Sequence, residues 1–297
     1  MSRIYDALRK RDEQGSEIDP ASVAKPVQAS AQEIHQLLVV PSIEARLKPE
    51  DRIVVHSDRR GAGAERFRLI CMSLRNSRAG KAPKILLITS PLPQDGKSTI
   101  ALNLATSLSE GGKVKVLLLE ADLHRPSLQS HLGLERMRGL TDVVEDLLEP
   151  AAALRRIDPL GFYLLPSGHP SENPTALLQS GGFHGLLRDF RACFEWILID
   201  CPPALPLADV TALRSQADGV LLVARSGSTP REAIEEAVQL FKPGQVLGLI
   251  LNAAEGVNRL YSSYYHRKDD ASSSHRSDRS DKSGSAVPHA LHLHHGS

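Results

Sequence analysis

Cysteine, aromatic residues and net charge are all scarce in this chain of 297 residues. The three cysteines, Cys71, Cys193 and Cys201, include no CxxC pair and are odd in number, which argues against a disulfide framework or a zinc site and suits a reducing compartment. The 36 basic and 35 acidic residues leave a formal net charge of +1. Bulk charge therefore gives no reason to expect nucleic acid as a partner.

Long hydrophobic runs are also missing. No apolar run approaches the roughly 20 residues that cross a bilayer. The N-terminal sequence MSRIYDALRKRDEQG contains no apolar signal-peptide core. We therefore expect a cytoplasmic protein with no membrane span of its own.

Short aliphatic runs alternate with helical patterns in the middle of the chain. The runs occupy residues 84–90, 115–121, 162–168, 196–200, 219–225 and 246–252. Uninterrupted apolar strands separated by helices predict an α/β fold with a doubly wound, mostly parallel sheet that is covered on both faces. A further helix is expected over residues 62–77. The core of the fold is placed at residues 61–256.

The two ends of the chain lack this pattern. Residues 1–60 are expected to be a flexible linker, irregular apart from a short helix in SRIYDALRKRDE, for which a frayed terminus is an open alternative. Residues 257–297 contain few aliphatic side chains and many Ser, Asp, Arg and His residues, so disorder is expected there.

The segment TSPLPQDGKST, residues 89–99, carries the strongest chemical signal. It follows an apolar strand and opens a helix, where backbone N–H groups converge on an anion. Lys97 is predicted to reach the phosphates of ATP, and the Ser98 hydroxyl to ligate Mg²⁺. The first glycine of the usual loop pattern is replaced by Pro91. The predicted nucleotide-binding residues are Gln94, Asp95, Gly96, Lys97, Ser98 and Thr99.

Three carboxylates stand at the ends of predicted strands. Glu120 and Asp122 lie two positions apart in VLLLEADLHRP, and Asp200 ends the strand in FEWILIDCPP. Parallel strands bring their carboxyl ends to one edge of the sheet, so these groups are candidate metal ligands and general bases beside the phosphate loop. Taken singly, each fits an ordinary polar strand end or a helix cap.

Tyrosines gather just beyond the last predicted strand. Three of the five in the chain, Tyr261, Tyr264 and Tyr265, fall in the segment YSSYY. Chance clustering, or an aromatic patch packed on the domain, is the alternative to a functional role.

Together these motifs resemble those of the bacterial tyrosine kinases that act in capsule and exopolysaccharide synthesis. The resemblance covers residues 62 to 265 and rests on GKST, LLLEADLHRP, ILIDCPPALPLAD and the tyrosine cluster. It implies a P-loop NTPase core that transfers phosphate from ATP, with Mg²⁺, to its own tyrosines. In the family, the first carboxylate of a D-x-D motif is the candidate base, and that position is Glu120 here. The implied catalytic residues are Lys97, Glu120, Asp122 and Asp200; the implied metal ligands are Ser98, Asp122 and Asp200; the implied acceptors are Tyr261, Tyr264 and Tyr265.

The resemblance also implies partners. The family uses an E-x-x-R-x-x-R helix for ring assembly. Here Glu65 and Arg68 match it, whereas Cys71 takes the place of the second arginine. A homo-oligomer is therefore expected, working with a membrane-spanning chain-length-determinant protein (a polysaccharide co-polymerase) at the inner face of the plasma membrane.

Two other functions share these motifs. ParA/MinD-type ATPases have the same fold and position other molecules without phosphorylating protein, but they usually carry an early loop lysine where this chain has PLPQDGK. The other is a scaffold that binds nucleotide and has lost phosphoryl transfer, which the departures at Glu120 and Cys71 would fit.

Overall fold

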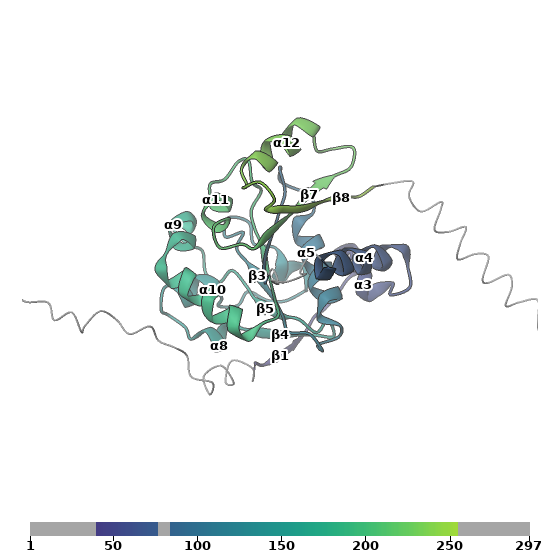
Figure 1. The fold of residues 1–297 in the computed structure, drawn as a ribbon. Helices are drawn as coiled ribbons and strands as arrows, with labels where there is room; N and C mark the ends of the chain where they lie inside the picture. Colours follow the sequence, from purple (N-terminus) through teal and green to yellow (C-terminus); the bar gives the residue numbers. More distant parts are fainter. Residues whose placement is uncertain (1–39, 77–83, 255–297) are drawn as a thin grey trace, which may run out of the picture. The chain divides into compact units, whose positions relative to one another are not determined.

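The computed structural model describes residues 40–76 and 84–254 (Figure 1). One eight-stranded sheet runs through this part of the chain, in the order β1-β4-β5-β3-β6-β2-β7-β8. The strands are β1 (Ser42–Glu44), β2 (Ile85–Thr89), β3 (Val116–Glu120), β4 (Arg155–Asp158), β5 (Tyr163–Leu165), β6 (Trp196–Asp200), β7 (Gly219–Arg225) and β8 (Val246–Asn252). The expected doubly wound, mostly parallel sheet is confirmed.

The central strands are buried on both faces because their sequences are almost wholly aliphatic. All residues of β2, β3 and β6 are buried, as expected for strands covered on both sides. Parallel pairing sets Glu120 of β3 level with Asp200 of β6, and Ile88 of β2 level with the same aspartate. The carboxyl ends of these strands therefore meet at one edge, where the candidate carboxylates and the phosphate loop lie.

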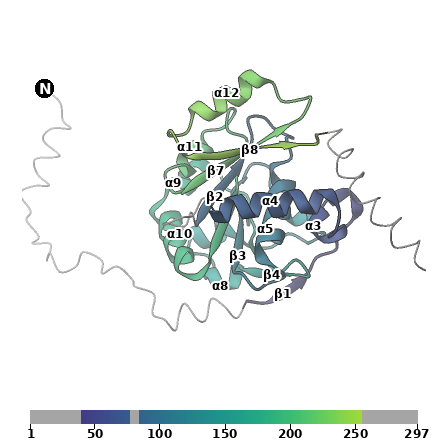
Figure 2. The same ribbon diagram turned by 45° about the vertical axis from the view of Figure 1, so that its right-hand side comes forward.

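Helices pack against both faces of the sheet (Figures 1 and 2). Alternate side chains of β3 enter different cores, Leu117 and Leu119 one and Leu118 the other. The core that contains Leu118 is completed by α3 (Val54–Ser57), α4 (Ala62–Asn76), α5 (Lys97–Ser109) and α6 (Leu128–His131). The opposite core receives α7 (Leu140–Val144), α8 (Pro150–Ala153), α9 (Pro174–Gln179), α10 (Gly181–Cys193), α11 (Asp209–Leu213) and α12 (Arg231–Gln239).

The segment before α4 differs from the irregular linker that its sequence suggests. Residues 42–57 form β1, the 3₁₀ turn η2 (Pro49–Asp51) and α3, and Ile53 is buried in the core. Neither β1 nor β4 was expected from the sequence. Their short runs, SIE and RRID, offer one aliphatic residue each, which is too little for a readable period. β4 also runs antiparallel to β5, unlike the central strands.

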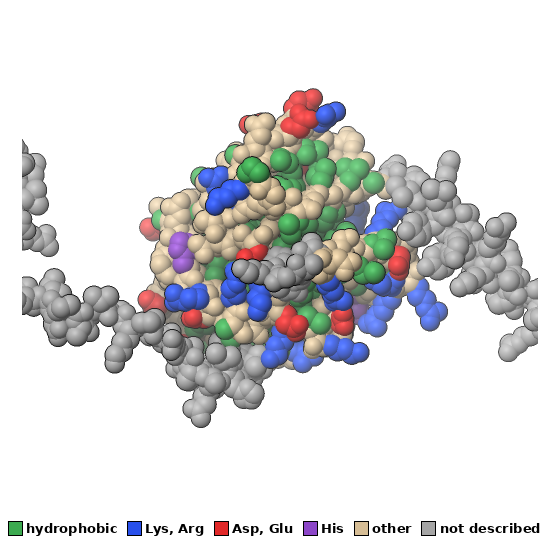
Figure 3. All heavy atoms as spheres, in the orientation of Figure 1, with side chains coloured by type: hydrophobic (Ala, Val, Ile, Leu, Met, Phe, Trp, Pro, Cys, Tyr) green, Lys and Arg blue, Asp and Glu red, His purple; other side chains and the backbone are tan. Residues whose placement is uncertain are grey.

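The edge strand β8 leaves apolar side chains on the surface. Leu249 and Leu251 are about half exposed, as are Leu69 and Met72 of α4. Figure 3 shows hydrophobic side chains around these two elements. No helix in the described ranges is long and apolar enough to cross a membrane. The candidate N-terminal helix and the tail from residue 257 lie outside the described residues.

Candidate phosphoryl-transfer site

The predicted phosphate loop connects β2 to α5. Two of its residues adopt positive φ, Gln94 at 67° and Gly96 at 94°. A Cβ atom at Gly96 would displace the side-chain amide of Asn252, and the positive φ strains any other residue at this position. Lys97 is then the first residue of α5, with Ser98 and Thr99 in its first turn. The helix N-terminus therefore faces the loop, which is the arrangement that favours a bound anion.

Asp95 supports the loop from within. Its Oδ1 accepts a hydrogen bond from Thr229 Oγ1 at 2.6 Å, and its Oδ2 accepts one from the Leu92 N–H at 3.2 Å. Its backbone carbonyl accepts a third from Asn252 Nδ2 at 2.9 Å. Asp95 is buried and both carboxylate oxygens are engaged. Asp95 therefore ties the loop to the segment after β7 and to the end of β8. Its contact with nucleotide stays a prediction.

A cavity of about 710 Å³ opens in front of the loop. Its walls combine the loop, the segment that follows β3, the proline-rich segment after β6 and the end of β7. The side chains that matter below are Glu50, Arg52, Lys97, Ser98, Thr99, Asp122, His124, Arg125 and Arg225. Of the predicted nucleotide-binding residues, all except Asp95 line this cavity. Its position outside the carboxyl ends of parallel strands is where this fold class binds ligands.

Lys97 and Asp122 meet in the cavity wall. Lys97 Nζ lies 2.8 Å from Asp122 Oδ2, and both side chains are largely buried. Burial lowers the pKa of Lys97, but the nearby charges of Asp200 and Asp122 outweigh it and hold that pKa above its usual value. Lys97 therefore remains a cation beside the phosphate loop. The second oxygen of Asp122 accepts a hydrogen bond from the Arg125 N–H at 3.0 Å.

Asp200 lies behind this pair, with no exposed surface. Burial raises its pKa to about 7 against the opposing positive charge of Lys97. No described residue makes a hydrogen bond of normal geometry to either carboxylate oxygen, although the neighbouring Ser98 hydroxyl lowers the pKa of Asp200. Buried polar atoms are normally paired, and an unpaired pair of oxygens beside a phosphate loop fits a cation or its bound water. Ser98 and Asp200 are thus suitable ligands for Mg²⁺, and the predicted metal roles of Ser98, Asp122 and Asp200 stay predictions.

Glu120 is placed differently from the expected general base. Its Oε1 accepts hydrogen bonds from the N–H groups of Ser127 and Leu128 at 2.6 and 2.7 Å. Its Oε2 accepts a third from the Ser167 N–H at 3.1 Å. The side chain is buried and does not line the cavity. In this arrangement Glu120 joins the segments after β3 and β5 and satisfies their backbone donors.

A histidine and an aspartate beside the cavity were not predicted. His124 Nε2 lies 2.7 Å from Asp209 Oδ2, and Thr175 Oγ1 donates to the other oxygen of the same carboxylate. Asp209 is buried at the start of α11. The sequence interval of 85 positions hid this contact. The HRP of LLLEADLHRP was its only local signal.

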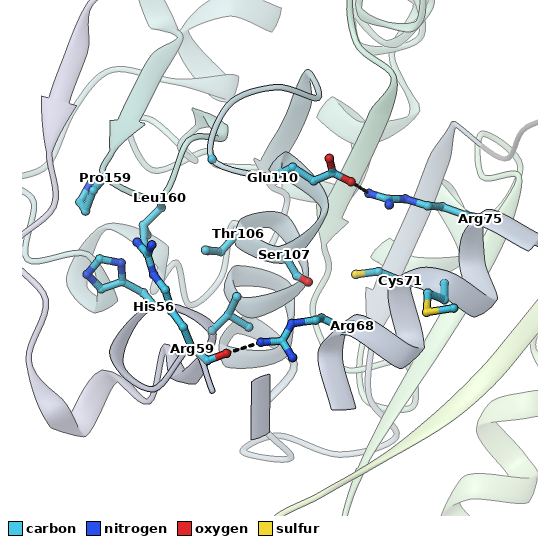
Figure 4. Close-up of a pocket in the computed structure, with 13 residues that line it drawn as sticks. His56, Arg59, Arg68, Cys71, Arg75, Thr106, Ser107, Glu110, Pro159 and Leu160 are labelled. Atoms are coloured by element: carbon cyan, nitrogen blue, oxygen red, sulfur yellow. Dashed lines mark hydrogen bonds and ion pairs between the residues drawn. The ribbon is translucent and has the colours of Figure 1, made fainter. Parts of the chain in front are cut away.

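The predicted assembly residues Glu65 and Arg68 lie on α4, and neither lines the nucleotide cavity. Figure 4 shows Arg68 and Cys71 beside a second cavity. Arg68 pairs with Glu65 and also donates to the carbonyl oxygen of Arg59. Cys71 is buried in the wall of this second cavity, of about 520 Å³, that Arg59 and Arg68 also line. The assembly role of Glu65 and Arg68 stays a prediction.

The predicted acceptors Tyr261, Tyr264 and Tyr265 lie outside the described residues. Among the tyrosines, the structure describes Tyr163, whose ring packs edge-on against Phe194 with centroids 5.4 Å apart.

Comparison with known proteins agrees with this geometry. Residues 82–269 match the ParA family model, described as NUBPL iron-transfer P-loop NTPase. The tyrosine-protein kinase YwqD of Bacillus subtilis is 31% identical over 219 residues, covering 73% of this chain and 92% of that protein. The succinoglycan biosynthesis transport protein ExoP of Rhizobium meliloti is 30% identical over 209 residues, covering 69% of this chain and 26% of that protein.

Solved structures show the same fold. The chimerical protein CapA2B2 superposes with a TM-score of 0.66 at 23% identity, covering 76% of this chain and 99% of that one. The VpsO kinase domain gives a TM-score of 0.57 at 29% identity, covering 66% of this chain and 100% of that one. The chain therefore belongs to the ParA-type P-loop NTPases and, within them, to the bacterial tyrosine kinases.

Proposed function

We propose that this chain is a protein-tyrosine autokinase, which transfers the γ-phosphoryl group of ATP to tyrosines of its own C-terminal cluster. The observation that carries the proposal is the Lys97–Asp122 ion pair beside Ser98, in a cavity that also adjoins the buried carboxylate of Asp200. These are the groups that phosphoryl transfer needs for positioning and charge neutralisation. Membership of a kinase family makes tyrosine the expected acceptor.

The reaction forms a bond between a tyrosine oxygen and the γ-phosphorus and breaks the bond from that phosphorus to the bridging oxygen of ATP, so ADP leaves. Lys97 would neutralise the phosphates, and Ser98 and Asp200 would hold Mg²⁺, with Asp122 beside them. Mg²⁺ supplies further neutralisation of the phosphate charge when bound.

The proton of the tyrosine hydroxyl must also be removed. Of the three predicted carboxylates, Asp122 lines the cavity, whereas Glu120 and Asp200 do not. Engagement of Lys97 with phosphate would release Asp122 from its ion pair. We therefore assign proton acceptance to Asp122 in place of Glu120.

The acceptors in this proposal are Tyr261, Tyr264 and Tyr265. A tethered segment supplies its tyrosines at a high effective concentration to a neighbouring subunit. Each phosphate adds about −1.5 to −2 charges, close to Arg259, Arg267 and Lys268 in the sequence. Phosphorylation would then weaken the docking of subunits, in a cycle of assembly and release.

The partner in this proposal is a membrane-spanning chain-length-determinant protein of an exopolysaccharide system, reached at the cytoplasmic face of the membrane. One relative, ExoP, is a succinoglycan biosynthesis transport protein. A ParA/MinD-type positioning ATPase is the less supported function, because the curated relatives include tyrosine-protein kinases at 31% identity.

The test compares wild-type protein with Lys97→Met after incubation with Mg²⁺-ATP, alone and with the cytoplasmic segment of the partner. Phosphotyrosine mapped by mass spectrometry should appear on the C-terminal cluster of the wild type and be absent from the variant. Circular dichroism should show that both are folded. Phosphotyrosine that accumulates equally on the folded Lys97→Met protein would refute autokinase activity.

A further inference from the structure

We propose that Arg52 is a further catalytic residue, which contacts the transferred γ-phosphoryl group and stabilises the charge that develops on it. Arg52 is the last residue but one of a short segment, Lys48–Ile53, which we call the strap. The strap precedes the region in which the motifs lie, and the sequence alone assigned it to a linker. This inference deepens the proposed kinase function and rests on it.

The strap forms part of the nucleotide cavity. Glu50 and Arg52 line it together with Lys97 and Asp122. In the sheet, β3 lies on one side of β2 and β7 on the other. Asp122 follows β3 on the first of these sides, and α6 lies on that side too. From α6, His131 places its Nδ1 3.7 Å from Asp51 Oδ1 of the strap. The strap therefore belongs to the side of the cavity where Lys97 meets Asp122, opposite the β7 end that Arg225 occupies.

That side is where the terminal phosphate is expected. Lys97 of a phosphate loop reaches the β- and γ-phosphates, and here its ammonium group turns toward Asp122. Arg52 lines the same cavity, and the guanidinium of an arginine is suited to planar, bidentate contact with phosphoryl oxygens. Within the described ranges no carboxylate lies within ion-pair distance of Arg52, whereas Lys97 has such a partner.

Buried Asn103 attaches the strap to the helix that carries the loop. Its Nδ2 donates to the Arg52 carbonyl oxygen at 3.0 Å and to the Thr99 carbonyl oxygen at 2.9 Å. Its Oδ1 accepts from the Val55 N–H at 3.2 Å. Asn103 is 1% exposed, so these bonds are sheltered from water. The strap and the first turn of α5 are thereby held as one unit.

The backbone of Arg52 is held in a conformation that few residues adopt. Its φ of 54° and ψ of 36° lie in the left-handed region, and its N–H donates to the Pro49 carbonyl oxygen at 3.3 Å. Such conformations in non-glycine residues cluster at functional sites when the surroundings enforce them. Ile53, which follows, is buried in the core. The contacts that hold the strap at Arg52 come from its backbone, and its side chain is exposed to the cavity.

Because the backbone of Arg52 holds the strap and its side chain is exposed, the effect of the side chain on the reaction rate can be predicted separately from its effect on the fold. As the tyrosine oxygen approaches the γ-phosphorus and the bond to the bridging oxygen of ATP lengthens, negative charge spreads over the phosphoryl oxygens and the leaving ADP. A guanidinium that meets that charge in the transition state lowers the barrier more than it strengthens substrate binding. Loss of the side chain should therefore lower kcat and leave the affinity for ATP nearly unchanged.

The experiment uses the full chain with Arg52→Ala and Arg52→Lys, and Arg60→Ala as the matched control. Arg60 is exposed on the same N-terminal segment and lines neither cavity. Autophosphorylation in single turnover should fall about 100-fold in Arg52→Ala, fall less in Arg52→Lys, and not change in Arg60→Ala. Dissociation constants for a non-hydrolysable ATP analogue should agree within about threefold across all four proteins. A drop in affinity that accounts for the whole loss, or an unchanged rate, would show that Arg52 is not catalytic.

A second readout separates this inference from the kinase assignment. Magnesium ADP with aluminium fluoride imitates a planar phosphoryl group, and its binding needs no acceptor tyrosine. Wild-type and Arg60→Ala proteins should bind it more tightly than ADP alone, and Arg52→Ala should lose about 100-fold of that gain. Equal gains in wild type and Arg52→Ala, or no gain in the wild type, would overturn the role of Arg52. A wild type that shows the gain but forms no phosphotyrosine would overturn the kinase function alone.

Discussion

Lys97 Nζ and Asp122 Oδ2 lie 2.8 Å apart across the floor of the nucleotide cavity. The lysine follows the phosphate loop after β2, and the aspartate lies in the segment after β3. In the sheet, β6 lies between β2 and β3. This contact joins the group that neutralises phosphate to the carboxylate that we assign as proton acceptor. Replacing Asp122 alone separates proton acceptance by Asp122 from phosphate neutralisation by Lys97.

Asp122→Asn is expected to lower the rate of autophosphorylation by about 10²–10³-fold, because the amide cannot take the proton of the tyrosine hydroxyl. Affinity for ATP should change much less, since Lys97 remains charged beside Asp200. Single-turnover transfer and equilibrium binding of an ATP analogue measure the two effects. A variant that transfers phosphate at the wild-type rate would remove Asp122 from the mechanism.

Glu120→Gln is expected to affect stability first. The carboxylate accepts hydrogen bonds from three backbone N–H groups, and an amide nitrogen would face one of these donors. The free energy of unfolding, measured in urea, should fall by about 2–3 kcal/mol. Glu235→Gln on the exposed surface of α12 is the control and should change it by less than about 1 kcal/mol. If Glu120 were the general base, Glu120→Gln would lose phosphoryl transfer while its free energy of unfolding stayed unchanged.

Asp200→Asn should show the effect of pH on the metal-free protein. The pKa of Asp200 is raised to about 7 by burial, from about 3.9 in an unfolded chain. Between these values the folded state binds more protons than the unfolded state, so the free energy of unfolding of the wild type falls as pH rises. In EDTA, the melting temperature of Asp200→Asn should exceed that of the wild type at pH 8, and the difference should shrink at pH 5. A difference independent of pH would mean that the Asp200 carboxyl does not titrate in this range.

Replacing Tyr261, Tyr264 and Tyr265 together by phenylalanine should remove most of the phosphotyrosine formed with Mg²⁺-ATP. Tyr163→Phe is the matched control. Tyr163 lies on β5, half-buried against Phe194, so loss of its hydroxyl should leave the total phosphotyrosine nearly unchanged. Peptide mapping by mass spectrometry locates the modified positions. Undiminished phosphotyrosine in the triple variant would place the acceptors elsewhere.

Much of the fold followed from local sequence. Runs such as KILLITS and VLLLEA are aliphatic over a full strand length, so they can only be buried, and their alternation with helical patterns indicates a parallel sheet. The phosphate loop was recognisable because its glycine and lysine serve a local backbone geometry. Lys97, Ser98 and Thr99 line the cavity in front of this loop, and their contact with nucleotide stays a prediction.

Other features could not be inferred in this way. β1 pairs with β4, which lies far along the chain, and β4 pairs also with the adjacent β5, while the residues of β1 and β4 themselves carry almost no period. The same limit applied to Glu120, whose sequence position fits either a base or a backbone acceptor. The alternative of an ordinary polar strand end, left open for it, is close to what the structure shows.

The sequence by itself determined the sheet, the phosphate loop and the family, because buried strands and phosphate loops depend on residues that are adjacent in the chain. Only the tertiary structure decided which carboxylate faces the cavity and which is occupied by backbone donors. It also brought the strap to the start of α5, where Asn103 bonds the Arg52 carbonyl across an interval of 51 residues. Contacts of that kind depend on packing between distant segments, and no local pattern encodes them.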